Sequence, residues 1–434
     1  MPEHTDFQPY LASARGSRAG RTTDAATAFA EIPDGGRILI PTLSGVPMGL
    51  LAALDDARDR WSSLEIVTGT LREPPAPLDH AGAPFHFATW QFSRPLRPAE
   101  QAGALRVIPA RYSQTATLFQ PHGPVPVDAV LVSASPPGPD GNLSLGVAVG
   151  SVIDAVRSAP LVIAQVNPAM PYVFGAGELP PDAFDFLVHI ESPLPELTRA
   201  PPGPLEEAIA EHVVGLVPDG ATLQFGIGAI PEAVMARLAA RRDLGIHSGL
   251  ISDGLIDLLE SGALTNAAKS QDAGVMIAAV CGGTRRLFDW LHRNPEVRLA
   301  PARYSHGVDV VARSHRLVTI NSAISVGLDG SLNAETINGR LLSGPGGQPD
   351  YAEAAMAAPG GTGIVAMPST AAGGKASRIV RRLGAEEAVT IPRVLADRVV
   401  TEYGAAELRG RSLDERAAAL RAIAHPDFRD ALQI

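Results

Sequence analysis

The sequence predicts an α/β protein made of two tandem, mutually similar α/β domains with mainly parallel sheets. Short apolar runs alternate with helical segments along the chain, which is typical of parallel strands joined by helices. One unit of strand, glycine turn and helix occurs twice, and a proline-rich stretch lies between the two copies. These three observations favour two domains of one kind over a single large domain.

The first copy of this unit begins at residue 33. Residues 33–36 read Pro-Asp-Gly-Gly, a turn signal that precedes the apolar run 37–41. Residues 44–47 form a second turn signal, and the segment 48–60 places leucines on one face of a helix. Residues 64–67 then read as another strand. The order strand, helix, strand is the building block of a parallel sheet.

The second copy begins at residue 218. Residues 218–225 repeat the turn and the strand, and the chain then enters Gly226-Ile227-Gly228 before a helix that begins near Pro231. A second pair of landmarks is Asp-Gly-Asn-Leu-Ser at 140–144 and Asp-Gly-Ser-Leu-Asn at 329–333. Both pairs occur in the same order and at nearly the same separation, which indicates a duplicated domain.

Proline marks the boundary between the copies. The stretch 193–204 is so rich in proline that it disfavours a continuous helix or a central strand. We therefore predict an N-terminal domain at residues 1–198 and a C-terminal domain at residues 199–434 that carries the active-site loops. Tandem α/β domains commonly hold a ligand in the cleft between them.

The composition excludes several classes of function. The chain has 434 residues and a formal net charge of -10, and it contains no cluster of Lys and Arg. We therefore expect no nucleic-acid partner. It contains no uncharged apolar run of about eighteen residues, so we expect no membrane span. The single cysteine, Cys281, excludes an internal disulfide and fits a reducing cytoplasm. No spacing of a zinc or magnesium site occurs, so we expect no metal.

An ordered series of short motifs is the strongest functional signal. In the first half these motifs are residues 127–131, 140–146 and 166–171; in the second half they are residues 223–231, 251–254, 321–323, 343–348, 401–404 and 423–429. Together they resemble the acetyl-CoA hydrolase/transferase family, a group of family I CoA-transferases that includes butyryl-CoA:acetate and 4-hydroxybutyrate CoA-transferases. The resemblance covers nearly the whole chain and implies a CoA-transferase-like fold.

The resemblance implies an enzyme that acts on an acyl-CoA thioester and a small acceptor, with coenzyme A as part of the substrate and a homodimer as the assembly. In this family a glutamate attacks the thioester carbonyl and forms a covalent intermediate before CoA passes to a second carboxylate. Backbone donors must stabilise the oxyanion of each tetrahedral intermediate. Similarity assigns that role to Gly226, Gly228, Gly346 and Gly347, and it assigns CoA contacts to the loop from Gly344 to Gln348.

The sequence departs from the family where the nucleophile is expected. The family pattern is glycine, apolar residue, histidine, small hydroxyl residue, glutamate. We predict a glycine turn at residues 245–249, and there His247 and Ser248 are followed by Gly249 instead of glutamate. Glycine has no side chain, so the route through an enzyme thioester cannot start at this position. Gln165 is a second change, because glutamate is expected in that motif.

Three interpretations remain open. The acceptor, or another group, attacks the thioester directly, as the resemblance of the fold to the citrate lyase α subunit allows. Alternatively, the space at Gly249 admits a water or a larger nucleophile, which gives a hydrolase or an acyltransferase. In the third interpretation the chain binds CoA without catalysis. The catalytic candidates are His247, Ser248 and Gly249, although adjacent residues seldom point at one another and a packed histidine is an equally ordinary explanation.

A basic loop is the candidate site for the phosphates of CoA. Lys375, Ser377 and Arg378 follow two glycines, in what we predict to be a loop that enters a helix. Lys, Arg and hydroxyl groups at a helix start suit a phosphate. The alternative is a solvated helix start whose polar face continues through Arg381 and Arg382.

Overall fold

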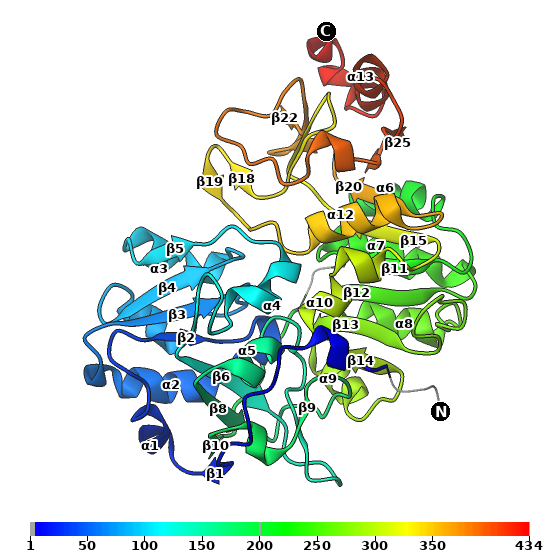
Figure 1. The fold of residues 1–434 in the computed structure, drawn as a ribbon. Coiled ribbons are helices and arrows are strands. Elements are labelled where there is room, and N and C mark those ends of the chain that lie inside the picture. The colour runs from blue at the N-terminus through cyan, green and yellow to red at the C-terminus, as the bar shows by residue number, and fades with distance from the viewer. Residues whose placement is uncertain (1–4, 199–200, 434) are drawn as a thin grey trace.

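The structure, a computed structural model, describes residues 5–198 and 201–433 (Figure 1). Each half of the chain forms one eight-stranded sheet with helices packed on it. The predicted domain boundary, between residues 198 and 199, falls next to residues 199–200, which lie outside the described residues. The two sheets follow one another along the chain, which confirms the tandem α/β architecture.

The first sheet is parallel throughout. Its strands, in spatial order, are β1 (Arg21–Thr22), β10 (Phe186–His189), β8 (Leu161–Val166), β6 (Ala129–Ala134), β2 (Arg37–Leu39), β3 (Leu64–Thr68), β4 (Phe85–Thr89) and β5 (Leu105–Val107). The helices of this half are α1 (Ala25–Phe29), α2 (Met48–Asp56), α3 (Arg97–Gln101), α4 (Thr115–Leu118) and α5 (Ile153–Ser158).

The second sheet is parallel except at one edge, where β25 runs antiparallel to β24. Its strands, in spatial order, are β14 (Val297–Leu299), β13 (Met276–Cys281), β12 (Gly245–Ile251), β11 (Thr222–Phe225), β15 (Leu317–Asn321), β20 (Thr362–Ala366), β24 (Arg398–Thr401) and β25 (Gly404–Glu407). The helices of this half are α6 (Pro204–Val214), α7 (Ala229–Arg237), α8 (Gly254–Glu260), α9 (Arg285–Leu291), α10 (Ala302–Ser305), α11 (Val308–Val311), α12 (Gln348–Ala357) and α13 (Leu413–Ala422).

The order of the strands confirms that the two halves are similar. In the first sheet, β2 lies in the middle, β3 to β5 follow on one side, and β6, β8 and β10 follow on the other. In the second sheet, β11 takes the middle place, β12 to β14 one side, and β15, β20 and β24 the other. The duplicated turn and strand seen in the sequence therefore mark the central strand of each sheet.

A small additional layer extends the second half at the top of Figure 1. It contains a three-stranded sheet, two hairpins and α13, built around a hydrophobic cluster of its own that includes Val326, Leu332 and Leu420. Its strands are β16 (Ser325–Gly327), β17 (Leu332–Asn333), β18 (Thr336–Ile337), β19 (Arg340–Leu341), β21 (Thr370–Ala371), β22 (Ala376–Ser377) and β23 (Ile379–Val380). In the first half, β7 (Leu143–Ser144) pairs with β9 (Glu178–Leu179).

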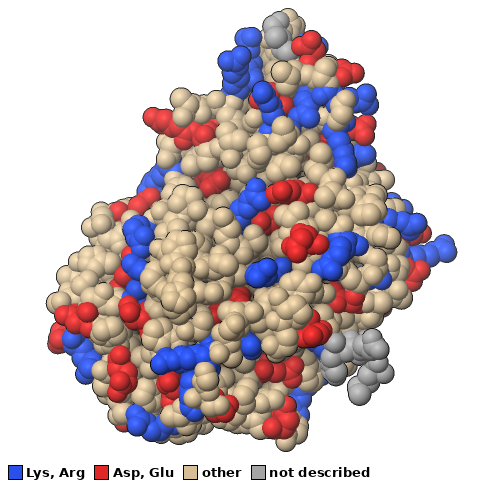
Figure 2. Space-filling model, viewed as in Figure 1, with Lys and Arg blue, Asp and Glu red and all other residues tan. Residues whose placement is uncertain are grey.

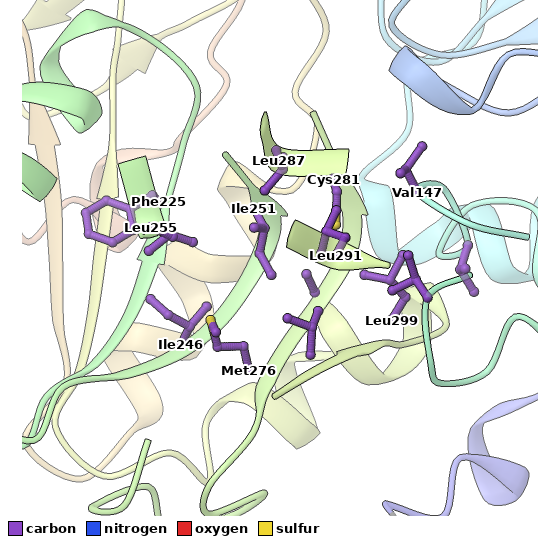
Figure 3. Packing of buried hydrophobic residues seen from close by; sticks show 14 of the residues in the cluster. Val147, Phe225, Ile246, Ile251, Leu255, Met276, Cys281, Leu287, Leu291 and Leu299 are labelled. Carbon is purple, nitrogen blue, oxygen red and sulfur yellow. The ribbon is translucent and has the colours of Figure 1, made fainter. Parts of the chain in front are cut away.

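The halves share one hydrophobic core. Val147 of the first half belongs to the same buried cluster as Cys281 and Leu299 of the second (Figure 3). The N–H of Cys281 also donates to the carbonyl of Val147 at 2.8 Å. Cys281 is fully buried among apolar residues, and burial raises the pKa of its thiol. The shared core holds the two sheets, and any cleft between them, in a fixed relation.

The surface agrees with the charge pattern of the sequence. Lys and Arg are interspersed with Asp and Glu over the face shown in Figure 2. In the part of the chain that the structure describes, no helix is both long and apolar enough to cross a membrane.

Candidate active site

A cavity of about 230 Å³ lies between the two halves. The first half lines it with Thr42, Leu43, Thr70, Gln91 and Tyr112. From the second half come the ends of β11 and β12, the segment Asn321–Ser322 and the loop 343–348. The ends of neighbouring parallel strands meet at one edge of a sheet, where open α/β sheets commonly bind ligands. The cavity therefore occupies the place where the sequence predicted a ligand cleft.

The turn after β11 reaches this cavity with one of its two glycines. Gly226 lines the cavity, but its N–H already donates to the carbonyl of Ile320 at 2.8 Å within the sheet. An N–H committed to a sheet bond is a poor oxyanion donor unless that bond opens. Gly228 precedes α7 with a φ of +140°, a conformation that favours glycine, and it lies outside the cavity lining.

The glycine loop 343–348 lines the cavity and contacts the first half. A Cβ atom at Gly344 would lie 2.8 Å from the carbonyl oxygen of Trp90, so only glycine allows this close approach. Gly346 has a φ of +54°, and its carbonyl accepts from the N–H of Tyr112 at 2.8 Å. Gln348 begins α12, and its Nε2 is buried without a hydrogen-bond partner among the described residues. The loop thus brings Gly344, Gly346 and Gln348 together at the cavity.

Residues 245–249 form part of strand β12, so the predicted glycine turn is wrong. β12 runs from Gly245 to Ile251 and pairs with β11 on one side and β13 on the other. Pairing on both sides keeps the backbone extended even where glycine would allow a turn. As a result His247, Ser248 and Gly249 alternate between the two faces of a sheet.

This alternation separates His247 from Ser248. The Ser248 hydroxyl is buried and exchanges hydrogen bonds with the backbone of Phe225, donating at 3.3 Å and accepting at 3.2 Å. The Nε2 of His247 lies 3.3 Å from the carbonyl oxygen of Tyr304, and burial lowers the pKa of His247 to about 4. Neither side chain lines the cavity. The structure therefore does not bring the two together as a nucleophile and a base.

Gly249 faces the cavity and is covered by a histidine that the sequence analysis missed. A Cβ atom at position 249 would lie 2.7 Å from Nε2 of His306 and 3.0 Å from its Cε1. The imidazole ring of His306 stacks on Tyr112, with 4.2 Å between centroids, and contacts Tyr351 at 4.9 Å. His306 therefore occupies the space that the first atoms of a side chain at position 249 would need.

Hydrogen bonds fix the orientation of this imidazole ring. Nδ1 of His306 lies 2.9 Å from the hydroxyl oxygen of Ser305, and that hydroxyl donates to the carbonyl of Pro301 at 3.1 Å. A hydroxyl has one proton, so the Ser305 oxygen accepts from Nδ1–H. Burial, followed by the nearby His247, lowers the pKa of His306 to about 3. The ring is thus neutral, and its unprotonated Nε2 faces Gly249 and the cavity.

Lys375, Ser377 and Arg378 do not line this cavity, and they do not enter a helix as predicted. Ser377 lies on β22, and its hydroxyl donates to the carbonyl of Ile379 at 2.7 Å. Arg378 is half-buried and its Nε donates to the carbonyl of Thr370 at 3.1 Å. The pairing of β22 with β21 converts the expected helix start into a hairpin, from which the exposed Lys375 projects.

Four other acid or amide groups have structural partners. Glu335 accepts from the Thr390 hydroxyl. Glu402 accepts from the N–H and the hydroxyl of Ser369, and Glu232 accepts from the Ser252 hydroxyl. Gln165, where the family resemblance leads us to expect glutamate, is fully buried; its amide accepts from the N–H of Leu50 and donates to the Ser192 hydroxyl. These bonds hold strands and loops in place.

Comparison with known proteins decides the family. Residues 66–191 match the acetyl-CoA hydrolase/transferase N-terminal domain, and residues 283–434 match the acetyl-CoA hydrolase/transferase C-terminal domain. The chain is 37% identical over 407 residues to the 4-hydroxybutyrate coenzyme A transferase of Clostridium kluyveri, covering 93% of this chain and 94% of that protein. It belongs to the acetyl-CoA hydrolase/transferase family. It is therefore an enzyme of the CoA-transferase or acyl-CoA hydrolase type.

Two further relatives support this membership. The butyryl-CoA:acetate CoA-transferase of Anaerostipes caccae is 33% identical over 366 residues, covering 82% of this chain and 81% of that protein. The crystal structure of RipA from Yersinia pestis superposes with a TM-score of 0.87 at 30% identity, covering 95% of this chain and 96% of that one. The sequence comparison and the structure comparison thus both extend over nearly the whole length of this acetyl-CoA hydrolase/transferase chain.

Proposed function

We propose that the cavity binds an acyl-CoA thioester and that the acyl group passes to an acceptor that attacks it directly, without an enzyme glutamate. One observation carries this proposal. Among the described residues that line the cavity, none is an Asp or a Glu, and position 249 is glycine. A glutamyl intermediate needs a carboxylate within reach of the thioester carbonyl, and this lining offers none.

The two ends of the cavity differ in chemistry. Leu43, Leu250 and Val280 line it and belong to one small hydrophobic cluster, which suits the acyl chain. Gln224 and Asn321 form a reciprocal amide pair, with distances of 3.1 Å and 2.9 Å. An amide nitrogen carries two N–H groups, so Asn321 retains a donor for the thioester oxygen. We place the carbonyl of the thioester between these two ends.

The body of CoA would leave this cavity along the glycine loop. Gly344, Gly346, Gly347 and Gln348 line the cavity, and the family resemblance assigns CoA contacts to the same loop. In the same proposal the domains are residues 1–198 and 199–434, and the enzyme is a cytoplasmic homodimer. Sedimentation equilibrium of the full chain measures the assembly directly.

An acyl-CoA panel tests the proposal. The purified chain is first titrated with CoA by calorimetry. It is then incubated with acetyl-, propionyl-, butyryl- and succinyl-CoA, with and without carboxylates and amines, while thiol release and products are followed. We expect CoA to bind and at least one thioester to be consumed, with no residue modified after borohydride reduction. Failure to bind CoA, or a reduced glutamate that maps to the enzyme, would contradict the proposal.

A further inference from the structure

We infer that His306 is the catalytic base of this site and that the acceptor it activates is water, which makes the enzyme an acyl-CoA hydrolase. This inference rests on the proposed function and specifies its acceptor. His306 is the only ionisable side chain other than Tyr112 and Tyr351 among the described residues that line the cavity. Within this lining, these three side chains are therefore the candidates for a group that accepts a proton at the thioester.

The tautomer of His306 suits a base. The chain of hydrogen bonds from Nδ1–H to Ser305 and on to Pro301 leaves Nε2 as the ring nitrogen with the lone pair. Nε2 has no hydrogen-bond partner among the described residues, and it lies against Gly249 at the cavity wall. A histidine base needs one ring nitrogen held by a hydrogen bond and the other free to take a proton.

The two tyrosines are poor alternatives. Burial raises the pKa of Tyr112 to about 12 and raises that of Tyr351 well above the ordinary value. The hydroxyl of Tyr351 also donates to the carbonyl of Ser305 at 2.7 Å. Both phenols therefore stay protonated at neutral pH, when they cannot accept a proton, whereas His306 stays unprotonated and can.

The missing glutamate leaves room for a water molecule. A Cβ atom at position 249 would lie 2.7 Å from Nε2 of His306, and both residues line the cavity, so with glycine at this position Nε2 borders the open cavity instead of a side chain. A water molecule occupies about 30 Å³, which is a small share of the 230 Å³ cavity. A water between Nε2 and the thioester carbonyl is thus placed for attack.

The kind of acceptor follows from the proton count. A carboxylate acceptor carries no proton at neutral pH, so transfer of CoA to a carboxylate needs no base. Water must lose a proton as it attacks. This site has a histidine lone pair that can accept a proton, and it has no carboxylate nucleophile. Such a site suits an acceptor that must lose a proton, such as water, and does not suit a carboxylate acceptor.

The reaction then balances as a hydrolysis. Nε2 takes one proton from water as the water oxygen bonds to the carbonyl carbon. The tetrahedral intermediate collapses, the carbon–sulfur bond breaks, and the departing CoA thiolate takes the proton from Nε2. The products are the free acid and CoA, and His306 returns to its neutral form. The oxyanion formed during attack favours the transient imidazolium, which offsets the cost of charging a buried ring.

The test compares variants of His306 with a surface histidine. His306→Asn keeps an amide N–H that can donate to Ser305 but has no base at the position of Nε2. We expect kcat for thiol release to fall by about 10²–10⁴-fold, the usual range for loss of a general base, with little change in KM or in CoA binding. His315→Asn, at an exposed site outside the cavity, is the matched control and should retain wild-type turnover.

Chemical rescue separates a base from a structural filler. His306→Ala leaves a hole between Tyr112 and Tyr351 that imidazole can enter. The rescued rate should rise with the basicity of the added azole, so imidazole should exceed 1,2,4-triazole, whereas simple filling of the hole would not follow basicity. Wild-type turnover in H₂¹⁸O should place ¹⁸O in the released acid.

The outcomes are distinct. Loss of kcat with intact CoA binding, rescue that follows basicity, and ¹⁸O in the acid support His306 as the base. Wild-type turnover in His306→Asn, or consumption of acyl-CoA only when a carboxylate is added, overturns the inference and leaves the proposed thioester function standing. Failure of the wild-type protein to bind CoA overturns the proposed function itself. If His306→Asn does not fold, the rescue series on His306→Ala decides.

Discussion

Introducing a glutamate at position 249 should not produce CoA transfer unless His306 is removed at the same time. A Cβ atom at Gly249 would lie 2.7 Å from Nε2 of His306, closer than non-bonded atoms tolerate. The ring cannot easily move, because Tyr112 and Tyr351 contact it and Ser305 holds its Nδ1. The substitution Gly249→Glu is therefore an overpacking change in a rigid site.

The expected energies follow from this contact. Gly249→Glu alone should lower the free energy of unfolding by about 1–3 kcal/mol, the usual cost of overpacking. His306→Ala alone should lower it by about 2–5 kcal/mol through the cavity that it leaves. In the double variant the glutamate occupies that cavity, so the two losses should not add. We expect a favourable coupling of about 1–3 kcal/mol, typical of residues in contact.

Urea unfolding of the wild type, both single variants and the double variant gives the coupling energy. In parallel, each protein is exposed to an acyl-CoA and acetate, reduced with borohydride and mapped by mass spectrometry. Only the double variant should transfer CoA and carry a reduced glutamyl adduct at position 249. Additive losses within about 0.5 kcal/mol, or a productive Gly249→Glu single variant, would refute the claim that His306 takes the place of the glutamate.

Three further predictions concern stability. Burial raises the pKa of Asp154 to about 6, so its contribution is favourable below about pH 4 and is lost as pH rises through 6. Asp154→Asn should therefore stabilise the protein at pH 7 by on the order of 1–3 kcal/mol in urea unfolding. Burial lowers the pKa of His247 and of His306, so their contribution to the free energy of unfolding is present above about pH 6.5 and is lost as pH falls toward 4. Replacing His306 with Asn should therefore make acid unfolding, followed by circular dichroism, less steep. Gly347→Ala would place Cβ 2.3 Å from Cδ2 of His306 and should lower both stability and turnover, whereas Gly384→Ala, with its nearest contact at 3.6 Å, should change neither.

Each of these predictions has a clear contrary result. An Asp154→Asn variant that is less stable than the wild type at pH 7 would mean that the carboxylate is charged and well solvated in the folded state. Equal steepness of acid unfolding with and without His306 would mean that the ring is not held neutral. Gly347→Ala with wild-type turnover would mean that the ring has room to move.

Much of the fold could be predicted from the sequence because its signals are local. The turn, strand and helix patterns at residues 33–67 and 218–231 marked the central strand of each sheet and the helix beyond it. The sequence also marked the loop 343–348 as glycine-rich, and in the structure Gly344 and Gly346 lie against Trp90 and Tyr112 of the other half. Such patterns depend on backbone geometry, which a few neighbouring residues decide.

Two local predictions were wrong because tertiary pairing overrode them. Gly245 and Gly249 suggested a turn, but β11 and β13 hold this segment extended between them. Lys375 to Arg378 suggested a helix start, but pairing of β22 with β21 makes a hairpin. Glycine permits both outcomes at similar cost, so the hydrogen bonds of neighbouring strands decide.

By itself, the sequence determined the α/β class, the duplication, the family resemblance and the glycine at position 249. Only the tertiary structure decided what fills the space at that glycine. His306 lies far from Gly249 along the chain, and no local pattern around it marks a site; it reaches the cavity because the end of β14 and the short helix α10 carry it beneath Tyr112. Contacts between residues so distant in sequence depend on how α10 packs beside β12 and Tyr112, and that packing is a property of the whole core.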